Sequence, residues 1–140
     1  MTMIGFNFTK IEVERKQPAV GQINISNNVN ITNIEETDLA FGKADEKGLK
    51  FSFKFDSKYD PDIGKIELNG EIIYIDDDKK LKEIIKEWKK SKNVSKEIMA
   101  EVLNSILLRC NIEALILSRE INLPPPIPLP KVSEQAEQKK

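Results

Sequence analysis

The chain has 140 residues, of which 39% are hydrophobic and 32% are charged, and its formal net charge is -1. That length supports one domain with a hydrophobic core, and the small net charge provides no overall positive field for nucleic acid. The chain contains no histidine and a single cysteine, Cys110. These absences exclude histidine-dependent catalysis, an intramolecular disulfide and the imidazole ligands of most zinc sites. We therefore expect no enzyme activity, no cofactor and no bound metal.

The distribution of apolar residues bears on where the protein works. Residues 1–10 lack the basic start and continuous apolar stretch of a signal peptide. The longest apolar region, residues 98–117, is interrupted by Glu101, Arg109 and Glu113, so it falls short of the roughly eighteen uninterrupted apolar residues of a membrane span. We expect a cytoplasmic protein with no integral membrane segment.

The first half of the chain alternates apolar and polar residues in four segments, the pattern of strands with one buried face. In the first segment, residues 4–15, the alternation changes parity once and predicts a bulge near Thr9. The stretch 35–48 is rich in charge and contains two glycines, so we expect a surface loop there. The other three predicted strands lie within residues 23–31, 49–56 and 66–75.

At Asp76–Asp78 the period of the apolar residues changes to that of a helix. The aspartates are suited to cap its start and favour its dipole, which explains them better than a metal site does. We expect a short amphipathic helix that ends near Lys90. Its apolar stripe, at the spacing i, i+3, i+4, i+7, consists of Leu81, Ile84, Ile85 and Trp88.

A longer helix is predicted to begin after Asn93 or Ser95 and to end near Arg119. It is apolar around most of its circumference, and a single sheet can cover only one side of it. The other side requires a partner helix, for which a second copy of the chain is the simplest source. The expected product is a homodimer or homotetramer, with Leu108, Ile112 and Leu115 as candidate interface residues.

The predicted order of elements is four strands and then two helices without interleaving. That order favours an α+β fold, in which a four-stranded antiparallel sheet is followed by a short crossover helix and one long helix packed on one face. After the long helix, Pro124–Pro130 should be extended and anchored by Leu123, Ile127 and Leu129. We assign residues 1–131 to a single domain and expect residues 132–140 to form a disordered charged tail.

The short helix also carries seven lysines, Lys79, Lys80, Lys82, Lys86, Lys89, Lys90 and Lys92. Such a pattern is typical of a helix that lies on an anionic membrane or beside nucleic acid. Glu83 and Glu87 dilute the positive charge. The alternative is a solvated face whose apolar stripe packs against the sheet.

The order of elements, together with the segment Ile121-Asn122-Leu123-Pro124, resembles the export chaperone family SecB. In that family a four-stranded sheet and a crossover lead to a long helix and a Leu-Asn-Leu-x-Pro-like segment. The chain looks most like the small archaeal SecB-like proteins, and the resemblance covers roughly residues 6–129.

The resemblance implies an ATP-independent holdase that captures unfolded polypeptide clients in apolar grooves and at strand edges. SecB is a dimer of dimers packed through its long helices, which agrees with the oligomer expected above. The client groove would then be lined or gated by the stripe of Leu81, Ile84, Ile85 and Trp88; alternatively, this stripe packs permanently on the sheet of its own chain. The competing functions are a dedicated protein adaptor with the same fold and a membrane or nucleic-acid binder that uses the lysines.

Overall fold

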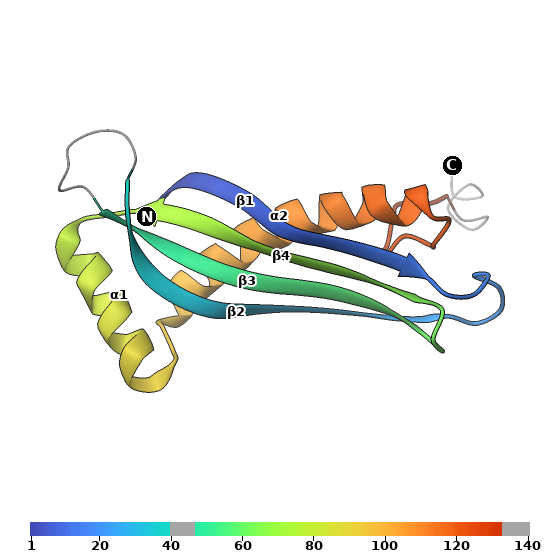
Figure 1. The fold of residues 1–140 in the computed structure, drawn as a ribbon, viewed down its shortest axis with the longest axis horizontal. Coiled ribbons are helices and arrows are strands. Elements are labelled where there is room, and N and C mark those ends of the chain that lie inside the picture. Colours follow the sequence, from blue (N-terminus) through green and yellow to red (C-terminus); the bar gives the residue numbers. More distant parts are fainter. Residues whose placement is uncertain (40–46, 133–140) are drawn as a thin grey trace.

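The computed structural model describes residues 1–39 and 47–132, which form one antiparallel sheet followed by two helices (Figure 1). The α+β fold expected from the sequence is therefore confirmed. Its elements are β1 (Thr2–Arg15), β2 (Asn24–Asp38), β3 (Lys47–Asp60), β4 (Gly64–Ile75), α1 (Asp78–Ser91) and α2 (Lys96–Glu120).

The strands lie in the order β1-β4-β3-β2, so the first two strands of the chain form the two edges of the sheet. The expected bulge in β1 is present, because the register with β4 shifts between Phe8 and Lys10. The same pairing also shifts between Met3 and Gly5, and the pairing of β2 with β3 shifts between Ile31 and Asn33. Both edge strands are thus bent near their middle, which increases the local twist of the sheet.

The core lies between the central strands β3 and β4 and the helix α2. Alternation places every second side chain of β3, including Phe51, Phe53 and Phe55, on the face that α2 covers. From α2 the side chains of Val102, Ile106, Cys110 and Ala114 point into the same core and are fully buried. They recur at every fourth residue, and α2 crosses the sheet face diagonally from the side of β2 towards β1 (Figure 1).

Both helices begin at the predicted caps. The Asp77 side chain accepts a hydrogen bond from the Lys80 backbone nitrogen at 2.9 Å, and the Ser95 hydroxyl accepts one from the backbone nitrogen of Ile98 at 3.4 Å. These bonds satisfy amide groups that the first turn of a helix leaves free. Between the helices, Lys92 adopts a left-handed conformation with φ of 57°, and this ends α1 and redirects the chain.

The segment after α2 folds back over the sheet, at the end opposite α1. Leu123 is buried, the Tyr59 hydroxyl donates to the carbonyl of Pro124 at 2.7 Å, and the Asn27 side-chain amide donates to the carbonyl of Pro126 at 2.8 Å. Leu123 is therefore an anchor, as expected, but Leu129 is 49% exposed and is not. Residues 133–140 of the expected tail lie outside the described residues.

The expected surface loop at residues 35–48 is corrected by the structure, since β2 continues to Asp38 and β3 begins at Lys47. The charged residues extend the hairpin because they continue the antiparallel backbone pairing of β2 with β3. Glu35 lies opposite Lys50, with its carboxylate 2.9 Å from the ammonium group. Residues 40–46 of that expected loop lie outside the described residues.

Replacement of Gly70 in β4 should destabilise the fold. A Cβ at this position would meet the carbonyl oxygen of Asn7 and would come within 2.7 Å of the Phe53 ring. We expect Gly70→Ala to lower the free energy of unfolding by about 2 kcal/mol, as measured by urea denaturation. Gly5→Ala is the matched control, because its nearest neighbour would be Ile73 at 3.6 Å. Equal destabilisation by the two variants would contradict this account.

Candidate functional site

The apolar stripe of α1, which the sequence offered as a polypeptide-binding site, faces the sheet of its own chain. Leu81 and Ile84 are each 2% exposed and Trp88 is 7% exposed. The Trp88 ring is also covered by the Lys92 ammonium group, 5.3 Å from the ring centroid. Only Ile85 is half-buried. In this structure three of the four residues are therefore part of the core. This is the alternative arrangement, in which the stripe packs on the sheet of its own chain.

A shallow groove runs along α1 on the side where Ile85 is open. Its volume is about 460 Å³, and Ile85 is its only apolar lining residue. One wall is basic, and Glu36 near the end of β2 is the acidic residue of the lining. The basic side chains of the groove are Lys82, Lys86, Lys89 and Lys90.

The outer face of α2 carries exposed apolar residues in its second half. Leu108 is 65% exposed, Ile112 is 51% exposed and Ile116 is 43% exposed. These side chains are spaced by four residues and form one row on the helix surface, beside which Leu115 is half-buried. We call Leu108, Ile112, Leu115 and Ile116 the α2 row. It contains all three residues predicted to form an oligomer interface.

The α2 row lies on the same side of the sheet as an exposed residue of edge strand β1. Ile11 is paired with the buried Leu68 and is nevertheless 49% exposed. The guanidinium carbon of Arg109 lies 5.2 Å from the ring centroid of Phe6, which shows that α2 passes beside β1. The helix therefore leaves part of the apolar face of β1 uncovered.

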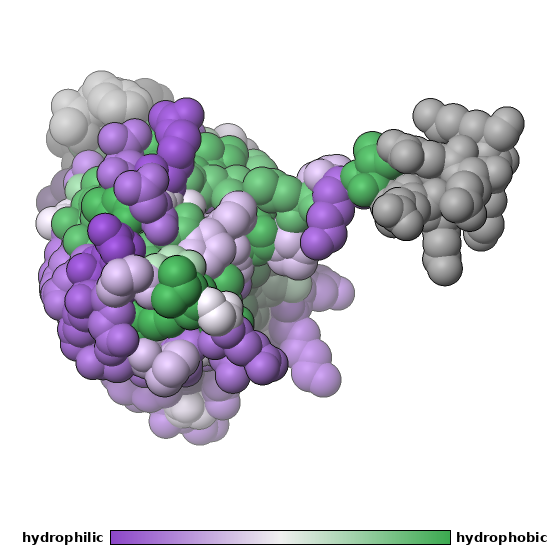
Figure 2. All heavy atoms as spheres, turned by 90° about the vertical axis from the view of Figure 1, so that its right-hand side faces the viewer, coloured by the Kyte–Doolittle hydropathy of each residue, from purple (hydrophilic) through white to green (hydrophobic). Residues whose placement is uncertain are grey.

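A second groove lies at the opposite end of the molecule from α1, where β2 begins. Its volume is about 620 Å³, and it is bordered by the β1–β2 connection, by β2 and by the segment that follows α2. Figure 2 views this end and shows hydrophobic surface among hydrophilic residues. We call it the β2 groove; its lining residues are Ala19, Gly21, Ile23, Ile25, Asn122, Leu123 and Pro124.

The open face of the sheet is polar and is connected by ion pairs. Lys10 and Lys54 both contact Glu67, which lies between them on β4, and Lys50 contacts Glu71 at 3.2 Å. Hydrogen bonds from Lys10 and Lys54 lower the pKa of Glu67 below its usual value. A face of paired charges binds water well and offers little apolar area, so it is an unfavourable surface for unfolded chains.

Two of the titratable side chains are buried in the core, and the acidic groups of the described residues do not gather at one point. Within residues 1–39 and 47–132 no cluster of three or more His, Cys, Asp or Glu side chains is placed to hold a metal ion. Burial raises the pKa of the Cys110 thiol to about 12 and that of the Tyr59 hydroxyl to about 12. A thiol with such a pKa stays protonated near neutral pH and is a weak nucleophile.

Neither helix of the described chain combines the length and the apolar character that crossing a membrane requires. A comparison with models of known protein families, with curated proteins and with solved structures finds no match to this chain.

Sequence reasoning missed the β2 groove. The alternation of Ile23, Asn24 and Ile25 indicates a strand, but it does not reveal which segment approaches that strand. The signal that could have located the groove is the proline run, since an extended segment with an apolar residue at Leu123 has to pack against something. The proline run lies over the ends of β2 and β3 because α2 points the chain towards that end of the sheet, and this direction cannot be read from the sequence.

The Cys110 thiol should be inert in the folded protein. It is fully buried in α2 and its pKa is raised to about 12, so a disulfide reagent at pH 8 should modify it at least about a hundredfold more slowly than in the urea-unfolded chain. Absorbance of the released thiolate measures the rate. A Cys110→Ala chain that carries Glu101→Cys, an exposed position on the same helix, is the control and should react rapidly. Rapid modification of Cys110 in the folded chain would show that this part of the core opens.

Proposed function

We propose that this protein is an ATP-independent holdase of the SecB-like kind, which binds non-native polypeptides and works as a homo-oligomer in the cytoplasm. The observation that carries the proposal is the β2 groove, where apolar side chains border the free edge of the sheet. Ile23 and Ile25 supply apolar contacts, and the outer backbone groups of β2 point away from β3. Both kinds of contact are useful to a protein that binds many sequences.

The edge of β2 offers main-chain hydrogen bonds that do not depend on the sequence of a client. Within the described residues β2 pairs with β3 alone, so one row of its N–H and C=O groups remains available. An extended segment that adds to such an edge gains backbone hydrogen bonds, and its alternate side chains enter neighbouring pockets. The β2 groove lies at the start of this edge and would receive those side chains.

The α2 row supports the oligomer. Monomeric proteins seldom expose a contiguous row of large aliphatic side chains, and three members of this row are between 43% and 65% exposed. The first half of the same helix face carries Glu101 and Asn104 instead. A second copy placed on the apolar half would bury the row.

A charge in the α2 row should dissociate the assembly. We expect Leu108→Glu or Ile112→Glu to convert an oligomer to a 16.0 kDa monomer, because an unpaired carboxylate is costly to bury between two helices. Native mass spectrometry at micromolar concentration gives the mass directly. Asn104→Glu is the matched control, since it adds the same charge on the polar half of α2. If the unchanged protein is already a monomer, the oligomer proposal is wrong.

A charge in the β2 groove should weaken client binding. We expect Ile23→Glu to lower the affinity for a reduced and carboxymethylated protein by about tenfold, because the carboxylate loses hydration when an apolar client segment covers it. Titration by fluorescence anisotropy measures the affinity, and suppression of light scattering from several unrelated denatured proteins measures the activity. A protein that suppresses the aggregation of only one of them is a dedicated adaptor.

Two controls separate the β2 groove from the stripe of α1. Ile85→Glu changes the only half-buried apolar residue of that stripe and should leave client affinity unchanged. Trp88 is the only tryptophan and is buried, so its fluorescence should not shift when a client without tryptophan binds. A shifted Trp88 signal together with a normal Ile23→Glu variant would move the client site to α1.

A further inference from the structure

Three lysines of α1 lie together on one part of its exposed surface, and Asp78, in the first turn, is the acidic residue nearest to that part. At 100° per residue, Lys82, Lys86 and Lys89 fall within a narrow sector next to Ile85. Glu83 and Glu87 fall further round the exposed surface, in a sector that also holds Lys80 and Lys90. The helix therefore presents a flank of lysines, which together with Lys90 forms one wall of the 460 Å³ groove beside β2. We call these four residues the lysine flank.

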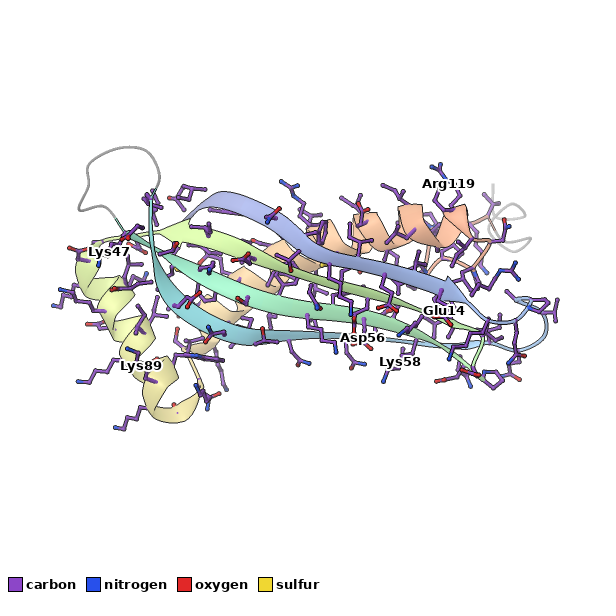
Figure 3. The ribbon with its side chains drawn as sticks, viewed as in Figure 1. Glu14, Lys47, Asp56, Lys58, Lys89 and Arg119 are labelled. Carbon is purple, nitrogen blue, oxygen red and sulfur yellow. The ribbon has the colours of Figure 1, made fainter. Side chains whose placement is uncertain are left out.

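The lysine flank has no acidic partner among the described residues. The one ion pair of an α1 lysine is that of Lys80, whose ammonium group lies 3.7 Å from the carboxylate of Asp76. Glu36, across the groove, is 3.8 Å from Lys47 and is thereby partly neutralised. Figure 3 shows Lys89 pointing outward from α1, at the end of the molecule that also carries Lys47. Four ammonium groups thus border a groove with one acidic residue.

We propose that the lysine flank docks an acidic, extended segment of a partner protein, with one apolar side chain of that segment on Ile85. Such a segment would match this surface in both charge and shape. Several carboxylates would pair with the lysines, and the groove would hold the segment along α1. This surface is distinct from the β2 groove, so the inference goes beyond client binding and can fail or succeed independently of it.

The position of the apolar residues favours a peptide over a membrane. A helix that binds a lipid surface inserts its apolar stripe into the headgroup region. Here Leu81, Ile84 and Trp88 of that stripe are buried against the sheet and are not available for insertion. Only Ile85 is open, and it sits in the groove, where a single side chain of a peptide can reach it.

The composition of the groove also favours a peptide over nucleic acid. Base recognition and stacking rely on arginine and aromatic side chains. The lining contains neither, and its lysines provide only point charges. The net charge of the whole chain is -1, so no wider positive field assists a polyanion.

The test uses the full-length protein and a fluorescent peptide that alternates pairs of glutamates with leucine. Anisotropy should report saturable binding that weakens steeply as the salt concentration rises from about 50 mM to about 300 mM. The triple variant Lys82→Gln, Lys86→Gln, Lys89→Gln should bind about tenfold more weakly, since exposed ion pairs contribute modestly and three are lost. Lys58→Gln, Lys96→Gln, Lys131→Gln removes the same charge elsewhere and should bind normally.

Four further measurements decide whether the partner is an acidic peptide. A peptide with glutamine in place of glutamate should not bind. Ile85→Ser should lower the affinity for the acidic peptide without changing the salt dependence of that affinity. Vesicles of phosphatidylserine and a single-stranded DNA oligonucleotide are tested in parallel. Tighter binding of either one would overturn the assignment to an acidic peptide. Equal loss in both triple variants would show general charge attraction and would also overturn it.

Discussion

One helix is too narrow to cover a four-stranded sheet, and the rest of this structure depends on that constraint. Four strands spaced by about 4.8 Å present an apolar face about 15 to 20 Å wide, whereas a helix is about 10 Å across. The alternation in β3 and β4 makes this face strongly apolar, with Phe51, Phe53 and Phe55 on it. Because α2 crosses diagonally, it covers the centre and leaves two corners and part of β1 uncovered.

The two corners are closed by different segments and the exposed part of β1 is not closed within the described residues, and these differences produce the candidate surfaces. At one corner α1 places Leu81, Ile84 and Trp88 on the sheet, so its outer side is left with lysines. At the other corner a short extended segment anchored by Leu123 is thinner than a helix, and the β2 groove remains beside it. Along β1 nothing in the described chain covers Ile11. This exposed side chain lies on the same side of the sheet as the α2 row.

The sequence predicts the elements better than it predicts what covers them. Alternation identifies β3, and helical spacing together with Asp77 and Ser95 identifies both helices, because these patterns are local. The sequence predicted a loop where β2 in fact continues to Asp38. Glu35 and the residues after it belong to the strand because they pair with β3, and a stretch of charged residues gives no sign of that pairing. The spacing of the apolar residues around Trp88 predicts a helix face that must be buried. That spacing is the same whether a client or the chain's own sheet packs on the face.

The two proposed binding surfaces are separated enough to act independently. They lie at opposite ends of the sheet (Figure 1), and strands of 14 residues at about 3.3 Å per residue place these ends roughly 45 Å apart. Charges are screened within about 8 Å at physiological ionic strength, so the lysine flank adds nothing to the potential at Ile23. The chemistry also differs, because apolar capture at the β2 groove tolerates salt whereas ion pairing on α1 does not. The two proposals are therefore compatible with each other: a client at one end and an acidic partner at the other would be bound together, and any coupling between them would have to pass through the packing of the sheet.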